Sequence, residues 1–94
     1  MLIQSVRFTF DIADAVEAEA QFRELRDASR KEAGVVGFEV AKGVEQPNVF
    51  ALWEVYRDQD ALDAHQATDH FARLVLNGVR PLAQQRSADL VVPI

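Results

Sequence analysis

The stretch Val49–Tyr56 constrains the fold more than any other part of the chain, because the strand that it predicts is apolar on both faces. Its β-branched and aromatic residues favour a strand, and alternate side chains of a strand point to opposite faces. Glu54 is its only charged residue. Both faces of this strand therefore need cover in the folded protein.

The N-terminal third of the chain predicts a strand followed by a helix. Leu2–Phe10 places most of its large apolar side chains at alternate positions, which is typical of a strand with one buried face. Asp14 and Glu17 have the spacing of a capping box, and apolar residues then recur at helical spacing. We expect the helix to run to about Ala33 and to end at Gly34.

The middle of the chain predicts a hairpin. Val35–Lys42 alternates in the manner of a strand, and Gly43–Asn48 supplies turn residues before Val49–Tyr56. These two strands are expected to pair with each other.

The C-terminal half predicts a second helical stretch and a last strand. The stretch is expected to start near Asp58, with Thr68 able to cap a continuation. Gly78 and Pro81 are expected to end it, and residues 88–92 are expected to form a short final strand.

The element order is therefore β-α-β-β-α-β over one predicted domain, residues 1–94, which is the ferredoxin-like α+β arrangement. Two helices can cover only one face of its four-stranded sheet. Because Val49–Tyr56 needs cover on both faces, we infer that the other face packs against a second copy of the chain. The expected assembly is a homodimer, a dimeric α+β barrel formed through the sheet faces.

Charge and composition exclude several classes of protein. The chain carries 10 Lys and Arg against 15 Asp and Glu, a net charge of −5, so nucleic acid and anionic membranes are poor partners. The absence of Cys excludes disulfides, thiolate metal sites and thiol nucleophiles. No basic leader and no run of about 20 apolar residues is present, so we expect an unprocessed cytoplasmic protein without a membrane span.

The chain contains two histidines, the residue type whose reference pKa lies nearest to neutral pH, and neither predicts a metal site. On one continuous helix, the spacing of His65 and His70 separates them by about 140° around the axis, too far to share one ion. A helix break at Thr68 would weaken this objection, but no third ligand stands at a suggestive spacing. We therefore expect no metal. His70 is interpreted as a residue that helps to order the start of a helix.

His65 shares a stripe with Ala61 and Leu62, which directs its imidazole toward the interior. One interpretation is a buried neutral histidine bonded to a backbone carbonyl. The other is a general base or a substrate hydrogen-bonding group in an apolar pocket.

Glu54 lies in an apolar strand, where a carboxylate needs a hydrogen-bonding partner or acquires a raised pKa. Arg7 and Arg73 are candidate partners for a structural ion pair, and a catalytic acid or base is the alternative. Tyr56 lies on the same side of the strand, and its phenol is able to donate to a substrate oxygen. Half-exposed packing is the other interpretation of Tyr56.

Trp53 and Phe71 are aromatic residues that we interpret first as core or dimer-interface residues and second as platforms for a substrate. The sequence contains no Gly-rich phosphate loop and no nucleophile-elbow serine.

The middle of the chain, from about Gly34 to Phe71, resembles the antibiotic biosynthesis monooxygenase family. The most specific part is a strand Glu followed by an aromatic residue, then a helix His, then Thr-x-His-Phe. The segments that carry the resemblance are Gly34–Val40, Pro47–Tyr56, Asp60–His65 and Thr68–Phe71.

The resemblance implies a homodimeric ferredoxin-like α+β barrel and, for some members, oxidation of quinols or polycyclic phenols by dioxygen without any cofactor. A phenolate is itself able to reduce dioxygen, so a base such as His65 and an apolar aromatic pocket would suffice. The catalytic residues expected from it are His65, Glu54 and Tyr56, and the expected substrate-binding residues are His70, Phe71, Trp53 and Arg73.

Departures from the family pattern leave alternatives open. The segment after Phe71 has no axial His for haem, so haem degradation is disfavoured. The family also includes isomerases of phosphorylated hydroxy-diketones, for which Arg73, Arg80 and Arg86 are able to hold a phosphate. A third alternative is a dimeric ligand-binding module without catalytic activity.

Overall fold

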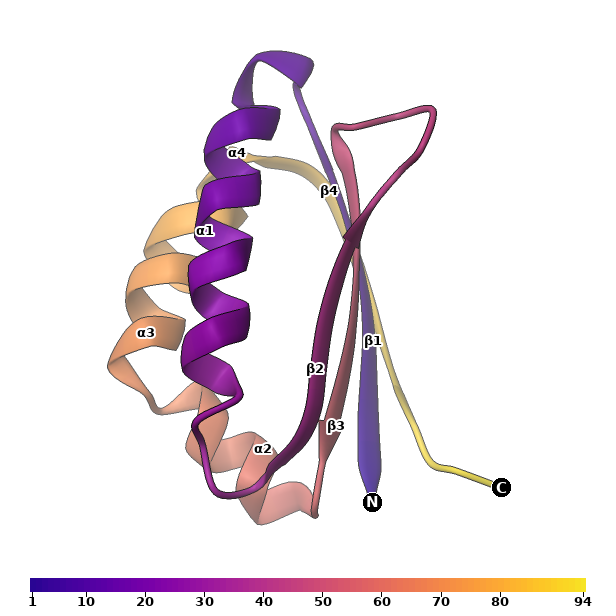
Figure 1. Ribbon diagram of the computed structural model, residues 1–94, viewed down its shortest axis with the longest axis vertical. Coiled ribbons are helices and arrows are strands. Elements are labelled where there is room, and N and C mark those ends of the chain that lie inside the picture. The colour runs from indigo at the N-terminus through magenta and orange to yellow at the C-terminus, as the bar shows by residue number, and fades with distance from the viewer.

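The computed structural model describes residues 1–94 and contains one antiparallel sheet with all its helices on one face (Figure 1). The strand order is β2-β3-β1-β4, so the first strand in sequence lies in the middle of the sheet. The strands are β1 (Leu2–Phe10), β2 (Val35–Lys42), β3 (Val49–Tyr56) and β4 (Ala83–Val91).

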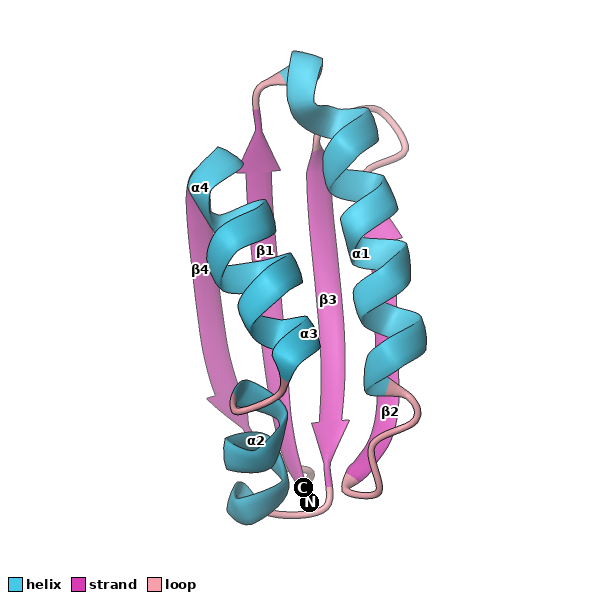
Figure 2. Ribbon diagram, turned by 90° about the vertical axis from the view of Figure 1, so that its left-hand side faces the viewer, coloured by secondary structure: helices cyan, strands magenta, loops and turns pink.

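The helices form two rows on the covered face, as Figure 2 shows. One row is α1, which lies over β2 and β3, and the other runs beside it over β1 and β4. No helix in the structure has both the length and the apolar character needed to cross a membrane. The helical segments are η1 (Ile12–Asp14), α1 (Ala15–Ser29), α2 (Gln59–Gln66), α3 (Asp69–Phe71), η2 (Ala72–Val79) and α4 (Arg80–Leu82).

The predicted α+β ferredoxin-like order is confirmed, but three predicted boundaries are wrong. Helix α1 ends at Ser29, so the segment up to Gly34 is a turn and not a last helical turn. Pro81 lies inside α4, so the helical stretch continues past it to Leu82. Gly78 does not end the helical stretch either, because η2 continues through it to α4.

Strand β4 is longer than the predicted residues 88–92, because it pairs with β1 from Ala83 to Val91. Most of its side chains are exposed, since it is an edge strand. An edge strand of this kind lacks the apolar alternation by which a buried strand is recognised.

The core lies between the sheet and the helices. Phe8, Phe10 and Phe50 from the sheet contact Phe22 of α1, with ring centroids 5.0 to 5.9 Å apart. Aromatic pairs at such distances add to the free energy of burying the rings. The opposite face of the sheet carries no helix (Figure 1), and there Trp53 is 48% exposed.

Candidate active site

The second helical stretch is broken at Thr68, and this break creates the site. Helix α2 ends at Gln66, and Thr68 is the N-cap of α3. The Thr68 hydroxyl donates to the His65 carbonyl at 2.7 Å and accepts from the Phe71 N–H at 3.2 Å. The turn brings together two imidazoles that a continuous helix would hold apart.

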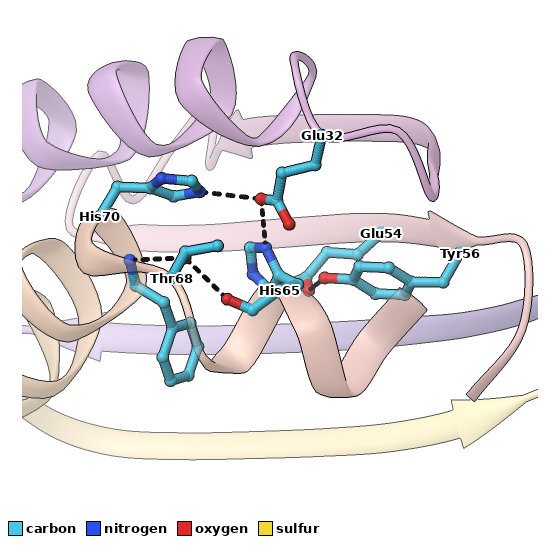
Figure 3. A network of polar contacts seen from close by, with 7 residues as sticks. Glu32, Glu54, Tyr56, His65, Thr68 and His70 are labelled. Carbon is cyan, nitrogen blue, oxygen red and sulfur yellow. Dashed lines mark hydrogen bonds and ion pairs between the residues drawn. The ribbon is translucent and has the colours of Figure 1, made fainter. Parts of the chain in front are cut away.

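Glu32 joins the two histidines. Its Oε2 atom lies 2.8 Å from Nδ1 of His65 and 2.8 Å from Nε2 of His70 (Figure 3). Glu32 comes from the turn between α1 and β2. A neutral imidazole that donates from Nδ1 keeps an accepting lone pair on Nε2, so Glu32 selects the tautomer of His65.

The His65 side chain is 2% exposed and is enclosed by aromatic rings. Its ring centroid lies 5.4 Å from that of Tyr56, 5.3 Å from that of Phe71 and 5.6 Å from that of Phe38. Burial lowers the pKa of His65, and the hydrogen bond to Glu32 opposes this shift. The balance keeps His65 neutral near neutral pH, which is the form that accepts a proton.

Glu54 is 5% exposed and lies on the covered face of β3. The Tyr56 hydroxyl donates to Glu54 Oε1 at 2.5 Å, and neither Arg7 nor Arg73 pairs with Glu54. Burial raises the pKa of Glu54 to about 7, although the Tyr56 hydrogen bond lowers it. Burial and the neighbouring Glu54 carboxyl also raise the pKa of Tyr56, so its phenol remains a donor.

A cavity of about 20 Å³ lies between the sheet and the helices, next to Glu54 and His65. This volume holds about one water molecule. Its polar lining consists of Gln4, Glu54, His65, Gln66, Arg80 and Arg86, and apolar side chains supply the rest.

Two arginines line the cavity without forming ion pairs. Neither Arg80 nor Arg86 forms an ion pair, and the buried Nε atom of Arg80 has no hydrogen-bonding partner. Arg80 lies over the ring of Phe71 and Arg86 over the ring of Phe8, each 5.7 Å from the centroid. Burial and the charge of Arg80 lower the pKa of Arg86, and the Glu54 carboxyl opposes this shift. The cavity is therefore suited to a negatively charged oxygen.

The structure gathers five of the seven expected site residues and leaves two outside. His65, Glu54, Tyr56, His70 and Phe71 lie within one network of hydrogen bonds and ring contacts. Trp53 instead points to the bare face of the sheet, since it pairs across from Ser5 on the side opposite Glu54. Arg73 is also elsewhere, because it pairs at the surface with Glu24 at 2.7 Å.

Glu32 is the residue of the site that sequence reasoning missed. The sequence predicts Glu32 to lie in the last turn of a helix. It is 33 residues from His65 and 38 from His70, so no local pattern connects it with the histidines. The one available signal was a carboxylate two residues before Gly34.

A one-sided antiparallel sheet with a polar site under its helices defines a ferredoxin-like α+β protein. Comparison with known proteins identifies the family within this fold class. The model of the family described as antibiotic biosynthesis monooxygenase matches residues 1–75, and the chain belongs to this family.

Solved structures agree over almost the whole chain. A crystal structure described as antibiotic biosynthesis monooxygenase is 25% identical, with a TM-score of 0.93, and the match covers 100% of this chain and 99% of that one. PA3566 from Pseudomonas aeruginosa is 29% identical, with a TM-score of 0.91 and coverages of 99% and 93%. Rv0793 from Mycobacterium tuberculosis, 22% identical with a TM-score of 0.87 and coverages of 99% and 94%, shares the fold. No curated protein matches the chain.

Proposed function

We propose that this protein is a cofactor-independent monooxygenase that oxidises a quinol or polycyclic phenol with dioxygen. Membership of the antibiotic biosynthesis monooxygenase family supports the class of reaction. The observation that carries the proposal is the Glu32–His65 hydrogen bond, which occupies Nδ1 of a histidine that lines a cavity together with Arg80 and Arg86.

The reaction begins with proton transfer from the phenol to Nε2 of His65. The resulting phenolate is held by Arg80 and Arg86, whose charges favour the anion over the neutral phenol. The electron-rich phenolate reduces dioxygen, and a carbon–oxygen bond forms on the ring. One oxygen atom stays on the ring as a quinone carbonyl, and the other leaves as water with the two hydrogens lost by the substrate.

Glu54 and Tyr56 serve as a hydrogen-bonding pair at the wall of the cavity. With a pKa of about 7, Glu54 is able to give or take a proton near neutral pH. His70 and Phe71 complete the enclosure around His65.

Substrate entry requires the cavity to widen, since small-molecule pockets usually measure about 300–1,000 Å³. The segment η2, which covers the cavity with Val75, is a π-helix, and the next N–H, of Arg80, donates to the Val75 carbonyl. Such wide turns are rare and occur frequently at functional sites. We infer that η2 moves away from the sheet when substrate binds.

The proposed enzyme is a homodimer formed through the bare sheet face. Trp53 is exposed there, and Val55, Ile3 and Val91 form a row across β3, β1 and β4 on the same face. Burial of these apolar side chains against a second copy supplies the cover that strand β3 lacks.

The test is oxygen uptake by metal-stripped protein, with chelator present, across a panel of reduced naphthoquinols and anthrols. We expect saturable uptake that falls about 100-fold or more in His65→Ala and in His65→Gln, because general-base catalysis contributes at least this much. His65→Gln keeps a hydrogen-bonding side chain, so loss of activity in both variants is not a folding effect. Uptake equal to that of buffer, or unchanged in either variant, would contradict the proposal.

Two matched arginine variants test the anion site. Arg80→Ala is expected to raise KM or lower kcat, since Arg80 lines the cavity, while Arg73→Ala is expected to behave as the wild type because Arg73 pairs with Glu24 at the surface.

The unpaired Arg80 and Arg86 also favour a second candidate, an isomerase of phosphorylated hydroxy-diketones, because a phosphate would complement two guanidinium groups. Isomerisation of such a compound without oxygen uptake would favour this candidate. Ligand binding without turnover would favour a dimeric binding module.

A further inference from the structure

Glu32, His65 and His70 offer three metal-ligating atoms at one point of the structure. Oε2 of Glu32, Nδ1 of His65 and Nε2 of His70 all lie within 4.8 Å of one another. They come from the turn after α1, from α2 and from α3. His65 and His70 are too far apart around a continuous helix to share an ion, but the helix is interrupted at Thr68, so this objection does not apply. The third ligand, Glu32, comes from a distant segment.

We propose that these three residues form a binding site for a divalent transition-metal ion of the Zn²⁺ type. Neutral imidazole nitrogens together with one carboxylate oxygen are a ligand set that Zn²⁺ binds with bonds of about 2.0–2.2 Å. The histidine ring centroids are 6.1 Å apart and tilted by 57°, so the rings approach the point from different directions. Three protein ligands leave a fourth position for water.

The contacts need only a small rearrangement to accept the ion. Each nitrogen is now 2.8 Å from the same carboxylate oxygen, and an ion would replace the two N–H protons that hold the cluster together. Glu32 forms no ion pair with Lys or Arg, so no cation of the protein competes for its charge.

An ion is able to reach the site from solvent. The side chains of Glu32 and His70 are 16% and 20% exposed, although His65 is buried. A surface depression of about 340 Å³ lies beside the cluster and is lined by Glu32, Thr68 and Asp60 among others. The buried His65 therefore supplies the inner ligand, and Glu32 lines the depression from which an ion would enter.

This site goes beyond the proposed oxygenase function and does not depend on it. A metal on Nδ1 moves the remaining imidazole proton to Nε2, the atom proposed as the base. The two roles of His65 are thus mutually exclusive, and an oxygenase with the ion bound is expected to be inactive. Metal binding is measured directly, so it succeeds or fails whether or not any substrate is oxidised.

The test is titration of chelator-stripped full-length protein with Zn²⁺ by calorimetry and with Co²⁺ by visible absorption. We expect one ion per chain, a Co²⁺ spectrum of a low-coordinate site, and shifts of the His65 and His70 ring signals in NMR spectra. His70→Ala and Glu32→Gln are each expected to weaken binding by at least about 100-fold, because loss of a direct ligand exceeds the 10–100-fold typical of outer-shell changes.

Asp60→Asn is the matched control, because Asp60 is an acidic residue on the same depression but outside the ligand set. It is expected to bind Zn²⁺ with unchanged affinity. Circular dichroism of each metal-free variant checks the fold, and His70→Gln replaces His70→Ala if the latter unfolds. Absence of binding, affinity that is unchanged in the ligand variants, or equal loss in Asp60→Asn would overturn the proposal.

Discussion

At the scale of single residues, Glu54 is the carboxyl group whose pKa is raised by its surroundings into the neutral range. It is buried, it accepts from Tyr56, and its pKa is raised to about 7 from 4.5. A carboxyl whose pKa is raised by folding binds its proton more tightly in the folded state. Its contribution to stability is therefore fully present below about pH 4.5 and is lost as the pH rises through about 7.

Glu54→Gln is expected to remove this pH dependence, because an amide has the shape of a protonated carboxyl and does not titrate. The free energy of unfolding of the wild type, relative to that of Glu54→Gln, should fall by on the order of 3 kcal/mol between about pH 4.5 and pH 8. Urea denaturation at a fixed chain concentration measures the difference. A relative stability that is flat or rises with pH would show that Glu54 is not buried as described.

The residue scale also shows which parts of the site were predictable. Glu54 and His65 were recognisable because each is a polar group within a local apolar pattern. Glu32 has no such pattern around it, and its role arises from contacts with residues 33 and 38 positions away. Trp53 and Arg73 were expected near the substrate, but the face of a strand and the partner of a surface arginine are set by the tertiary structure.

At the scale of elements, the cap at Thr68 separates α2 from α3 and positions both histidines. Its hydroxyl makes two hydrogen bonds, one to the His65 carbonyl and one from the Phe71 N–H. Thr68→Ala is expected to lower the free energy of unfolding by about 1 kcal/mol, the usual value of an N-cap. Thr68→Ser keeps the hydroxyl and is expected to stay near the wild type in thermal denaturation. Equal stabilities of the Ala and Ser variants would contradict this role.

Gly34 holds the turn that carries Glu32 against α2. A Cβ at position 34 would collide with the Cα and Cβ atoms of Ala61, neither of which is able to swing away. Gly34→Ala is therefore expected to lower the free energy of unfolding by about 1–3 kcal/mol and to separate Glu32 from His65. Chemical denaturation measures the first effect, and the NMR signals of the His65 ring report the second.

Gly37→Ala is the control for Gly34→Ala. Its Cβ would lie 3.7 Å from the nearest atom, of Val55, which is an ordinary packing distance. If both glycine variants lose the same stability, the close approach of the turn to α2 is not the cause.

The elements themselves were largely predictable because strand alternation, helix caps and turn residues are local signals. The predicted order of strands and helices is confirmed. The break at Thr68 was one of the alternatives that the sequence left open, and the structure places an N-cap there. The early end of α1 and the length of β4 were not predicted. Both depend on pairing and packing with distant segments, as in the contact of β4 with β1 along Phe10 to Ile3.

At the scale of the whole molecule, the sheet has one covered face and one bare face (Figure 1). Trp53→Lys is expected to convert the proposed homodimer to a monomer, because it places a charge at the centre of the apolar part of the bare face. Light scattering after size-exclusion chromatography measures the mass. Val16→Lys, at a position 84% exposed on the outside of α1, should leave the mass unchanged. A wild-type monomer, or a dimer that survives Trp53→Lys, would contradict the assembly.

The single Glu32 oxygen that joins both histidines also bears on how the protein folds. The turn after α1 is connected to α2 and α3 only through the intervening hairpin of β2 and β3, so this contact closes a long loop of chain. Contacts between distant segments form after the local helices and the hairpin, because ordering these elements first reduces the entropy that is lost when the loop closes. The histidine cluster is therefore expected to form only after the intervening hairpin, and the appearance of its imidazole N–H signals would report this step of folding.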